Sequence, residues 1–266
     1  MRGGESGWRG LRRAVGDAAA VVAALDCPGC GRASNGVCGA CLAALREGLR
    51  VEWTALDGPQ RPSSLGRSTP GPEARPPGGG SATPLAVSAL PYDGVVRALV
   101  GALKERSRLD AASALAPLLR VSLAAALASA PDDAPEPARH ADPTRLSLVL
   151  APSSRASTRA RGFSPLETIA RRAVPRADHG LAARALRHTR RVADQAGLGV
   201  AGRAENQRGA IVAHPRMRGR RVVLVDDVVT TGATLREAVR ALADAGAETV
   251  AIAVVARTER RFPQTP

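Results

Sequence analysis

Two adjacent carboxylates, Asp226 and Asp227, follow an apolar run and precede a hydroxyl-rich turn. The run 222–225 is mostly β-branched, which is typical of a strand buried on both faces, and we expect the strand to end at the acid pair. At the carboxyl end of a parallel strand, such a pair can bind sugar hydroxyls or a hard Mg²⁺ ion.

The turn after the acid pair is suited to an anion. Apolar residues beyond it recur at the spacing of a helix packed on a sheet, and Gly246 is expected to end that helix. The first N–H groups of such a helix lack intrahelical partners and lie at the positive end of its dipole, so the turn can hold a phosphate. Gly232 lets the backbone approach a ligand, and the hydroxyls of Thr230, Thr231 and Thr234 add hydrogen-bond donors. The whole segment expected to bind the ligand consists of Val228, Val229, Thr230, Thr231, Gly232, Ala233 and Thr234.

Together the acid pair and the turn predict a site for a ribose 5-phosphate, with the phosphate at the turn and the vicinal hydroxyls at the carboxylates. The lysine-bearing Walker pattern is absent from the chain, which argues against a nucleoside triphosphatase. An ordinary strand–turn–helix unit of an α/β domain has the same order of elements, and the residues alone leave that alternative open.

All four cysteines of the chain lie in one short segment as two C-x-x-C pairs. Such pairs supply the four soft ligands that zinc takes in a tetrahedral structural site, so the spacing predicts bound Zn²⁺. A pair of disulfides and a redox-active C-x-x-C motif are the alternatives. Reducing surroundings disfavour the first, and the duplication of the motif disfavours the second. The predicted ligands are Cys27, Cys30, Cys38 and Cys41.

Positive charge is concentrated in the part of the chain that leads into the acid pair. The formal net charge is +14, and a single lysine, Lys104, stands among 38 basic residues. Between residues 155 and 221 there are 16 arginines against four carboxylates. A field of this sign attracts polyanions such as pyrophosphate or nucleic acid, although a solvated basic surface is the alternative for most individual arginines.

The order of expected elements divides the chain into three parts. Residues 1–56 hold a short helix and the four-cysteine segment, residues 57–84 form a disordered linker rich in Pro, Gly and Ser, and residues 85–266 form an α/β domain. No apolar run reaches the length of a membrane span, and we expect a cytoplasmic protein. Expected strands lie at 85–90, 146–151, 181–186, 221–225 and 249–256, expected helices at 11–24, 42–49, 92–105, 111–129, 166–173 and 235–245, and expected loops at 131–143, 152–163 and 194–208.

Residues 222–234 resemble the phosphoribosyl pyrophosphate (PRPP) signature of type I phosphoribosyltransferases: four apolar residues, two acids, two apolar residues and Thr-Thr-Gly-Ala-Thr. With the four cysteines, the chain as a whole resembles the ComF family of bacterial competence and phosphoribosyltransferase-like proteins. The further residues that carry this resemblance are Tyr92, Asp93, Gly94, Lys104, Arg161, Gly162, Phe163, Gln195, Arg203, Asn206 and Gly209. The chain departs from the family's usual pattern at residues 150–152 and 164–165.

The resemblance implies a type I phosphoribosyltransferase-like fold, in which helices flank a Rossmann-like parallel sheet, preceded by a small zinc-binding unit. It implies that PRPP binds with Mg²⁺, that Asp226 and Asp227 hold the ribose hydroxyls directly or through the metal, and that residues 230–234 hold the 5-phosphate. Arg155 or Lys104 would reach the pyrophosphate.

Three functions are compatible with this reading. The first is an enzyme that displaces pyrophosphate and transfers the phosphoribosyl group to an unknown acceptor. The second, implied by the competence members of the family, is an accessory protein of DNA uptake that binds single-stranded DNA or a helicase partner. The third is a protein that senses PRPP without turnover. Because aromatic residues are scarce, any contact with DNA should be mainly to phosphates and should depend strongly on salt.

Overall fold

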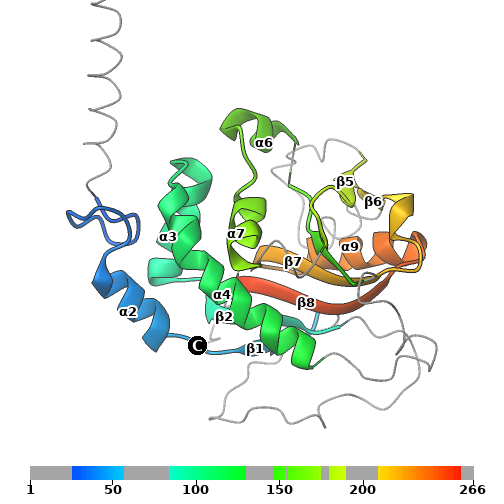
Figure 1. Cartoon of the computed structure of the whole chain (residues 1–266), viewed down its shortest axis with the longest axis horizontal. Coiled ribbons are helices and arrows are strands. Elements are labelled where there is room, and N and C mark those ends of the chain that lie inside the picture. Colours follow the sequence, from blue (N-terminus) through cyan, green and yellow to red (C-terminus); the bar gives the residue numbers. More distant parts are fainter. Residues whose placement is uncertain are drawn as a thin grey trace, which may run out of the picture.

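A computed structural model of the chain describes residues 26–56, 84–129, 146–153, 155–174, 180–189 and 209–258. A six-stranded sheet in the order β1-β2-β8-β7-β3-β4 forms the centre of this part of the chain (Figure 1). Strand β1 pairs antiparallel with β2, and every other pairing in this sheet is parallel. The strands are β1 (Glu52–Thr54), β2 (Ala86–Pro91), β3 (Leu146–Leu150), β4 (Gly180–Ala182), β7 (Arg221–Val229) and β8 (Glu248–Arg257).

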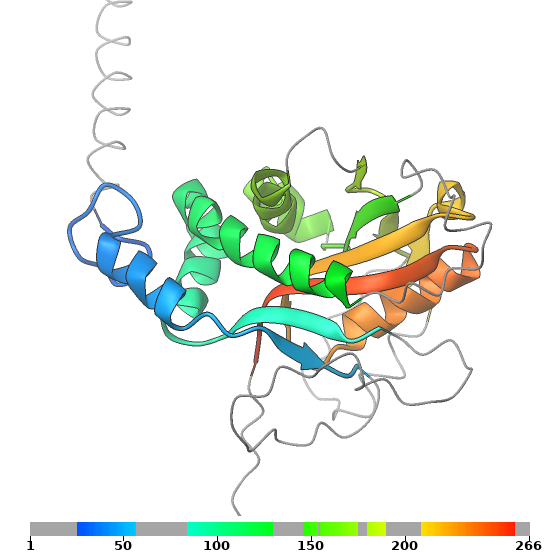
Figure 2. The ribbon, with the colours of Figure 1, turned by 60° about the horizontal axis from the view of Figure 1, so that its bottom comes forward.

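Helices cover both faces of the sheet (Figure 2). One face packs against α3 (Gly94–Glu105), α4 (Leu109–Ala128) and α7 (Pro165–Ala173), and the other packs against α9 (Ala233–Asp244). A separate antiparallel pair, β5 (Leu186–His188) with β6 (Ile211–Ala213), lies next to α9 and is followed by the 3₁₀ turn η3 (Pro215–Met217). Helices α2 (Gly39–Glu47) and α6 (Arg155–Arg161) complete the described elements.

The apolar start of β7 explains the position of the strand. Val223 and Val225 belong to the hydrophobic cluster on the α3, α4 and α7 side, and Val222 and Leu224 belong to the cluster on the α9 side. The run is therefore buried on both faces, as its composition predicts, and each fully buried Val or Leu side chain contributes about 1.5–3 kcal/mol. This burial fixes the strand that carries the acid pair.

The predicted fold class, an α/β domain with a mostly parallel sheet, is confirmed. Gly246 follows α9 with a φ of 77°, as expected of the residue that ends a helix. The predicted helix 11–24, the loops 131–143 and 194–208, and the linker apart from residue 84 lie outside the described residues. The proposed domain limits remain predictions, and β1, from the N-terminal part, extends the main sheet.

Three predicted elements were wrong in detail. Strand β7 does not end before the acid pair but continues to Val229, because its partner β8 supplies ladder bonds along that length. The predicted loop 152–163 contains helix α6, whose Arg, Ala, Ser and Thr residues include no Gly or Pro. The predicted strand 181–186 is divided between β4 and β5, which belong to different sheets.

Helix α4 also corrects the prediction that no apolar run reaches the length of a membrane span. Within the described residues, this one helix is long and apolar enough to cross a membrane, by length and composition only. More than half of its most apolar window is buried in the fold, where it packs on α7, β8 and β2. An interior helix of a folded domain passes the same test, so the feature is weak evidence for a membrane segment.

Candidate functional site

Strand β7 and helix α9 place the acid pair and the hydroxyl-rich turn next to each other. Asp226 and Asp227 lie in β7, where Asp226 is in register with Val254 of β8. After Val229 the chain turns, and Gly232 is the residue that precedes the first turn of α9. The predicted sequence of strand, acids, turn and helix is therefore present as one structural unit.

The acid pair has a cation of its own. Lys104, in the last turn of α3, places its Nζ 2.7 Å from Oδ2 of Asp227. The Asp227 side chain is only 12% exposed, whereas that of Lys104 is 37% exposed, so the lysine covers a carboxylate that is mostly withdrawn from water. The N–H of Asp227 donates to Oδ1 of Asp226 at 2.8 Å. A lysine at a helix carboxyl end is also favoured by the helix dipole.

Lys104 pairs with Asp227, and the pKa of Asp226 responds to its own burial and to both of these charged neighbours. Burial raises that pKa, and the neighbouring charge of Asp227 raises it further. The N–H of Asp227 and the charge of Lys104 act in the opposite direction, and the pKa of Asp226 is about 7. Asp226 thus changes its charge near neutral pH, and a cation or a hydroxyl donor that binds the pair competes with a proton. Carboxylate oxygens are the donors that Mg²⁺ prefers, so the pair suits that ion.

The turn after β7 has the properties of an anion site. Thr230 and Thr231 are exposed, and Thr234 is half-buried, so their hydroxyls lie at or near the surface. The N–H of Ala233 donates to Oγ1 of Thr231 at 3.3 Å. No side chain caps α9, and its first turn carries no acidic residue. The positive end of the helix dipole is therefore not offset by a carboxylate in the first turn of the helix itself.

Gly232 is buried, although the threonines around it are not. Its φ is 72° and its ψ is 1°, in the left-handed region that favours glycine. A Cβ at this position would lie 2.9 Å from Cδ2 of Leu56. The absence of a side chain at residue 232 therefore makes room for Leu56, in addition to any ligand that approaches the turn.

Of the two residues predicted to reach the pyrophosphate, the structure describes the side chain of only one. Lys104 lies at the acid pair, while Arg155 is the first residue of α6 and its side chain lies outside the described part of the structure. Sequence reasoning did not identify Leu56 or Arg236, which join at the turn although they lie 180 residues apart. No local sequence pattern links such distant positions, so only the fold reveals this contact.

The four predicted metal ligands come together at the N-terminal end of the described chain. Their sulfur atoms all lie within 4.8 Å of one another, with 3.7 Å between Cys27 and Cys41 and 3.6 Å between Cys30 and Cys38. A tetrahedron with Zn–S bonds of about 2.3 Å separates its sulfurs by about 3.8 Å. All four are free thiols, and these separations far exceed the length of about 2.05 Å of a disulfide. The arrangement fits a four-thiolate zinc site.

Two of these thiols have pKa values that are shifted in opposite directions. Burial raises the pKa of Cys27, but N–H groups of Cys38, Cys30 and Gly29 outweigh it and lower the pKa to about 6. Burial and the three neighbouring sulfurs raise the pKa of Cys41. A bound metal would replace the protons that the cluster holds at neutral pH.

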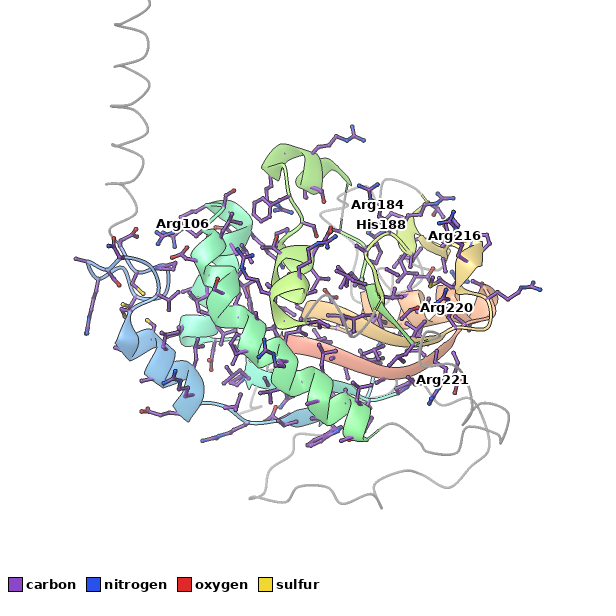
Figure 3. All side chains as sticks on the ribbon, in the orientation of Figure 1. Arg106, Arg184, His188, Arg216, Arg220 and Arg221 are labelled. Carbon is purple, nitrogen blue, oxygen red and sulfur yellow. The ribbon has the colours of Figure 1, made fainter. Side chains whose placement is uncertain are left out.

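Exposed arginines lie near the β5–β6 pair. Arg184 and Arg216 are exposed, and Figure 3 shows them on the same side of the molecule as His188. Arg221, the first residue of β7, and Arg220 before it are partly exposed, and Nε of Arg221 lies 4.0 Å from Oε2 of Glu248. His188 is held by a hydrogen bond between its Nε2 and the carbonyl of Pro152, at 2.9 Å.

Comparison with known proteins agrees with this geometry. Residues 160–263 match the family described as the phosphoribosyl transferase domain. A transcriptional regulator GfcR from Methanocella arvoryzae is 45% identical over 42 residues, which are 16% of this chain and 20% of that protein. An orotate phosphoribosyltransferase from Bartonella tribocorum is 58% identical over 38 residues, or 14% of this chain and 20% of that protein. The chain thus matches about a fifth of the length of these curated relatives.

Proposed function

We propose that this chain, which carries a phosphoribosyl transferase domain, binds PRPP together with Mg²⁺. Residues 230–234 would hold the 5-phosphate, and Asp226 and Asp227 would hold the ribose hydroxyls directly or through the metal. The observation that carries the proposal is the single strand–turn–helix unit, in which a carboxylate pair near the end of β7 is followed, after the turn, by a helix start that no side chain caps. The family match includes this unit but not Lys104.

Turnover is the further step of the proposal. Displacement of pyrophosphate from the sugar leaves negative charge on the departing group, and fixed positive charges lower the barrier to this step. Mg²⁺ would supply part of that charge. Lys104 lies at the acid pair, and Arg155 begins the helix after β3, so these residues are the proposed partners of the pyrophosphate. One similar protein is named a transferase and the other a regulator, so both an enzyme with an unknown acceptor and a PRPP sensor are retained.

We further propose that the chain belongs to the ComF family. The geometry of the four thiols supports this assignment, because it fits the structural zinc that the family's N-terminal cysteines suggest. The proposed location is the cytoplasm, where reducing conditions keep the thiols available to the metal.

The binding proposal is tested by calorimetric titration of the full chain with PRPP and Mg²⁺. Replacing both Asp226 and Asp227 by Asn should weaken this binding about ten- to a hundredfold for each charged contact that is lost, while binding of inorganic phosphate is largely retained. Glu47→Gln, which removes an exposed carboxylate on α2, serves as the control and should bind as the wild type does. Absence of PRPP binding by the wild type at millimolar ligand would remove both the enzyme and the sensor proposals.

Turnover is tested by release of pyrophosphate from PRPP when candidate bases or amines are supplied. An enzyme should release pyrophosphate with at least one acceptor, and the Asp226→Asn variant should be slower. Binding without release across the acceptors tested favours the sensor.

A second candidate function is contact with single-stranded DNA. The exposed Arg184 and Arg216 near β5 and β6 favour it, because arginines can neutralise successive phosphates. The logarithm of the affinity should then fall linearly with the logarithm of the salt concentration, and the Arg184→Ala, Arg216→Ala double variant should reduce the slope by about 1.4, which is about 0.7 for each phosphate contact with a single strand. Salt-insensitive binding, or none at low salt, would rule the candidate out.

A further inference from the structure

The guanidinium of Arg236 contacts the backbone of the proposed phosphate-binding turn. Arg236 belongs to the first turns of α9, and its backbone N–H donates to the carbonyl of Gly232 at 2.9 Å. Its Nη1 donates to the carbonyl of Thr231 at 3.2 Å and also to the carbonyl of Leu56. Both hydrogens of Nη1 are therefore engaged by backbone carbonyls of segments that are far apart in the sequence.

The bond to Thr231 determines which way the next N–H points. In a trans peptide the C=O and N–H groups point in opposite directions, so a Thr231 carbonyl directed at Arg236 turns the Gly232 N–H away from Arg236. The φ of 72° and ψ of 1° at Gly232 are close to those of the third residue of a type II turn. Reversal of this peptide would give a type I turn with φ near about −90°, which glycine adopts as readily.

Since glycine permits both orientations, a contact outside the turn is needed to select one. Arg236 provides that contact, and Leu56 holds Arg236 in place. Leu56 is 4% exposed, accepts a hydrogen bond from Nη1 and packs its side chain on Gly232. The segment that carries Leu56 is fixed in turn, because β1 pairs with β2 and Glu52 forms an ion pair with Arg257.

We propose that Arg236 is a positioning residue, which holds the Gly232 N–H toward the 5-phosphate of the ligand, and that Leu56 keeps Arg236 in the orientation required. This inference rests on the proposed function. Arg236 acts through the peptide between Thr231 and Gly232 rather than as a direct ligand of the phosphate, so its contribution should not depend on screening by salt.

The test is a titration of the full chain with ribose 5-phosphate, in which the ¹H–¹⁵N resonance of Gly232 reports on the turn. In the wild type, saturation should move the Gly232 amide proton downfield as it donates to the phosphate. Arg236→Ala should bind about tenfold more weakly, lose most of that shift, and show the same loss at low and high salt. Arg46→Ala, which removes an exposed positive charge on α2, is the control and should leave both readouts unchanged.

Each other outcome decides the proposal. Wild-type affinity in Arg236→Ala, or a loss that disappears at high salt, overturns it, because the first shows no role and the second shows a direct charge effect. If Arg236→Ala does not fold, Arg236→Gln replaces it, because the shorter side chain removes the guanidinium that bridges the two carbonyls. It should reduce affinity and the Gly232 shift in the same direction, and wild-type values of both would overturn the proposal.

If the wild type does not bind ribose 5-phosphate, the proposed function fails on its own. The positioning role is then decided without ligand by the Gly232 resonance. Displacement or doubling of that resonance in Arg236→Ala supports the role, and an unchanged position overturns it.

Discussion

The four thiols and the acid pair are both clusters of like ionisable groups, but they differ in the positive charge that lies beside them. At the acid pair, Lys104 supplies a positive charge 2.7 Å from Asp227. At the thiols, the nearby Arg106 and Arg108 are directed to the carbonyl of Pro28 and to Asp26. The acid pair therefore has a built-in counter-ion, whereas the thiols, once ionised, would need a bound cation to offset their charge. We propose that zinc at the cysteines would be part of the fold and that Mg²⁺ at the carboxylates would bind together with the ligand.

Removal of zinc should have the largest effect. Structural zinc contributes about 10–16 kcal/mol to the folding of small zinc-finger peptides, so its loss should unfold the segment around Cys27–Cys41 and lower the melting temperature. Elemental analysis should find about one zinc per chain, and a chelator should abolish the corresponding order in amide exchange.

The Cys41→Ser variant should reproduce the effect of the chelator, because it removes one of the four ligands. If protein purified under reducing, zinc-replete conditions contains no zinc, the proposal of a structural zinc at the four cysteines is wrong.

The second prediction removes the counter-ion of the acid pair. Lys104→Met should destabilise the protein by about 1–3 kcal/mol at neutral pH, between the values for exposed and buried pairs, because the mostly buried Asp227 then remains without its cation. Mg²⁺ should restore stability to this variant much more than it stabilises the wild type. Thermal melts with and without Mg²⁺ measure both effects.

A matched control for Lys104→Met is available on the surface. Arg171→Met breaks an exposed helical ion pair with Glu167, whose atoms are 2.6 Å apart, and should cost only about 0.3–0.5 kcal/mol without any response to Mg²⁺. Equal effects of the two substitutions would show that Lys104 has no special role.

The raised pKa of Asp226 predicts that the affinity for PRPP with Mg²⁺ depends on pH. Mg²⁺ requires ionised carboxylates, and the pKa of Asp226 is raised to about 7. Affinity for PRPP with Mg²⁺ should therefore rise with pH up to about 7 and level off above it, and below that pH it should fall about tenfold per pH unit.

The ligand's own phosphates titrate near pH 6, so the contribution of Asp226 has to be separated from theirs. Asp226→Asn retains the titration of the ligand and should lose the remaining dependence. A wild-type profile identical to that of Asp226→Asn would show that Asp226 does not control binding.

The residues that carried the sequence predictions are local in the chain. The run 222–225 predicted a buried strand, and the spacing of the cysteines predicted a cluster that the structure brings together. Contacts between distant segments were not predictable: the packing of Leu56 on Gly232, the use of Arg236 as a bridge and the addition of β1 to the sheet depend on tertiary structure. The ion pair between Lys104 and Asp227 was not predicted for the same reason. The sequence shows that a lysine lies at the end of a helix, but it does not show which carboxylate that lysine contacts.

The last prediction concerns the contact between Leu56, in the N-terminal part of the chain, and Gly232 in the turn. Gly219 and Gly232 both have φ near 70°, but a Cβ at Gly219 meets no atom within 4 Å, whereas one at Gly232 meets Leu56 at 2.9 Å. Gly219→Ala should therefore cost only the left-handed strain of about 1–2 kcal/mol, and Gly232→Ala should cost more.

A double-mutant cycle isolates the collision between residues 56 and 232. Leu56→Ala alone should destabilise the protein because it leaves a cavity, but in that background Gly232→Ala should cost no more than Gly219→Ala, because the space that the new methyl group needs has been vacated. The expected coupling is about 0.5–3 kcal/mol, measured by denaturant unfolding of the two single variants and the double variant. Additive effects would mean that the Leu56 side chain does not contact Gly232 in solution. Leu56 would then support Arg236 only through the hydrogen bond to its carbonyl.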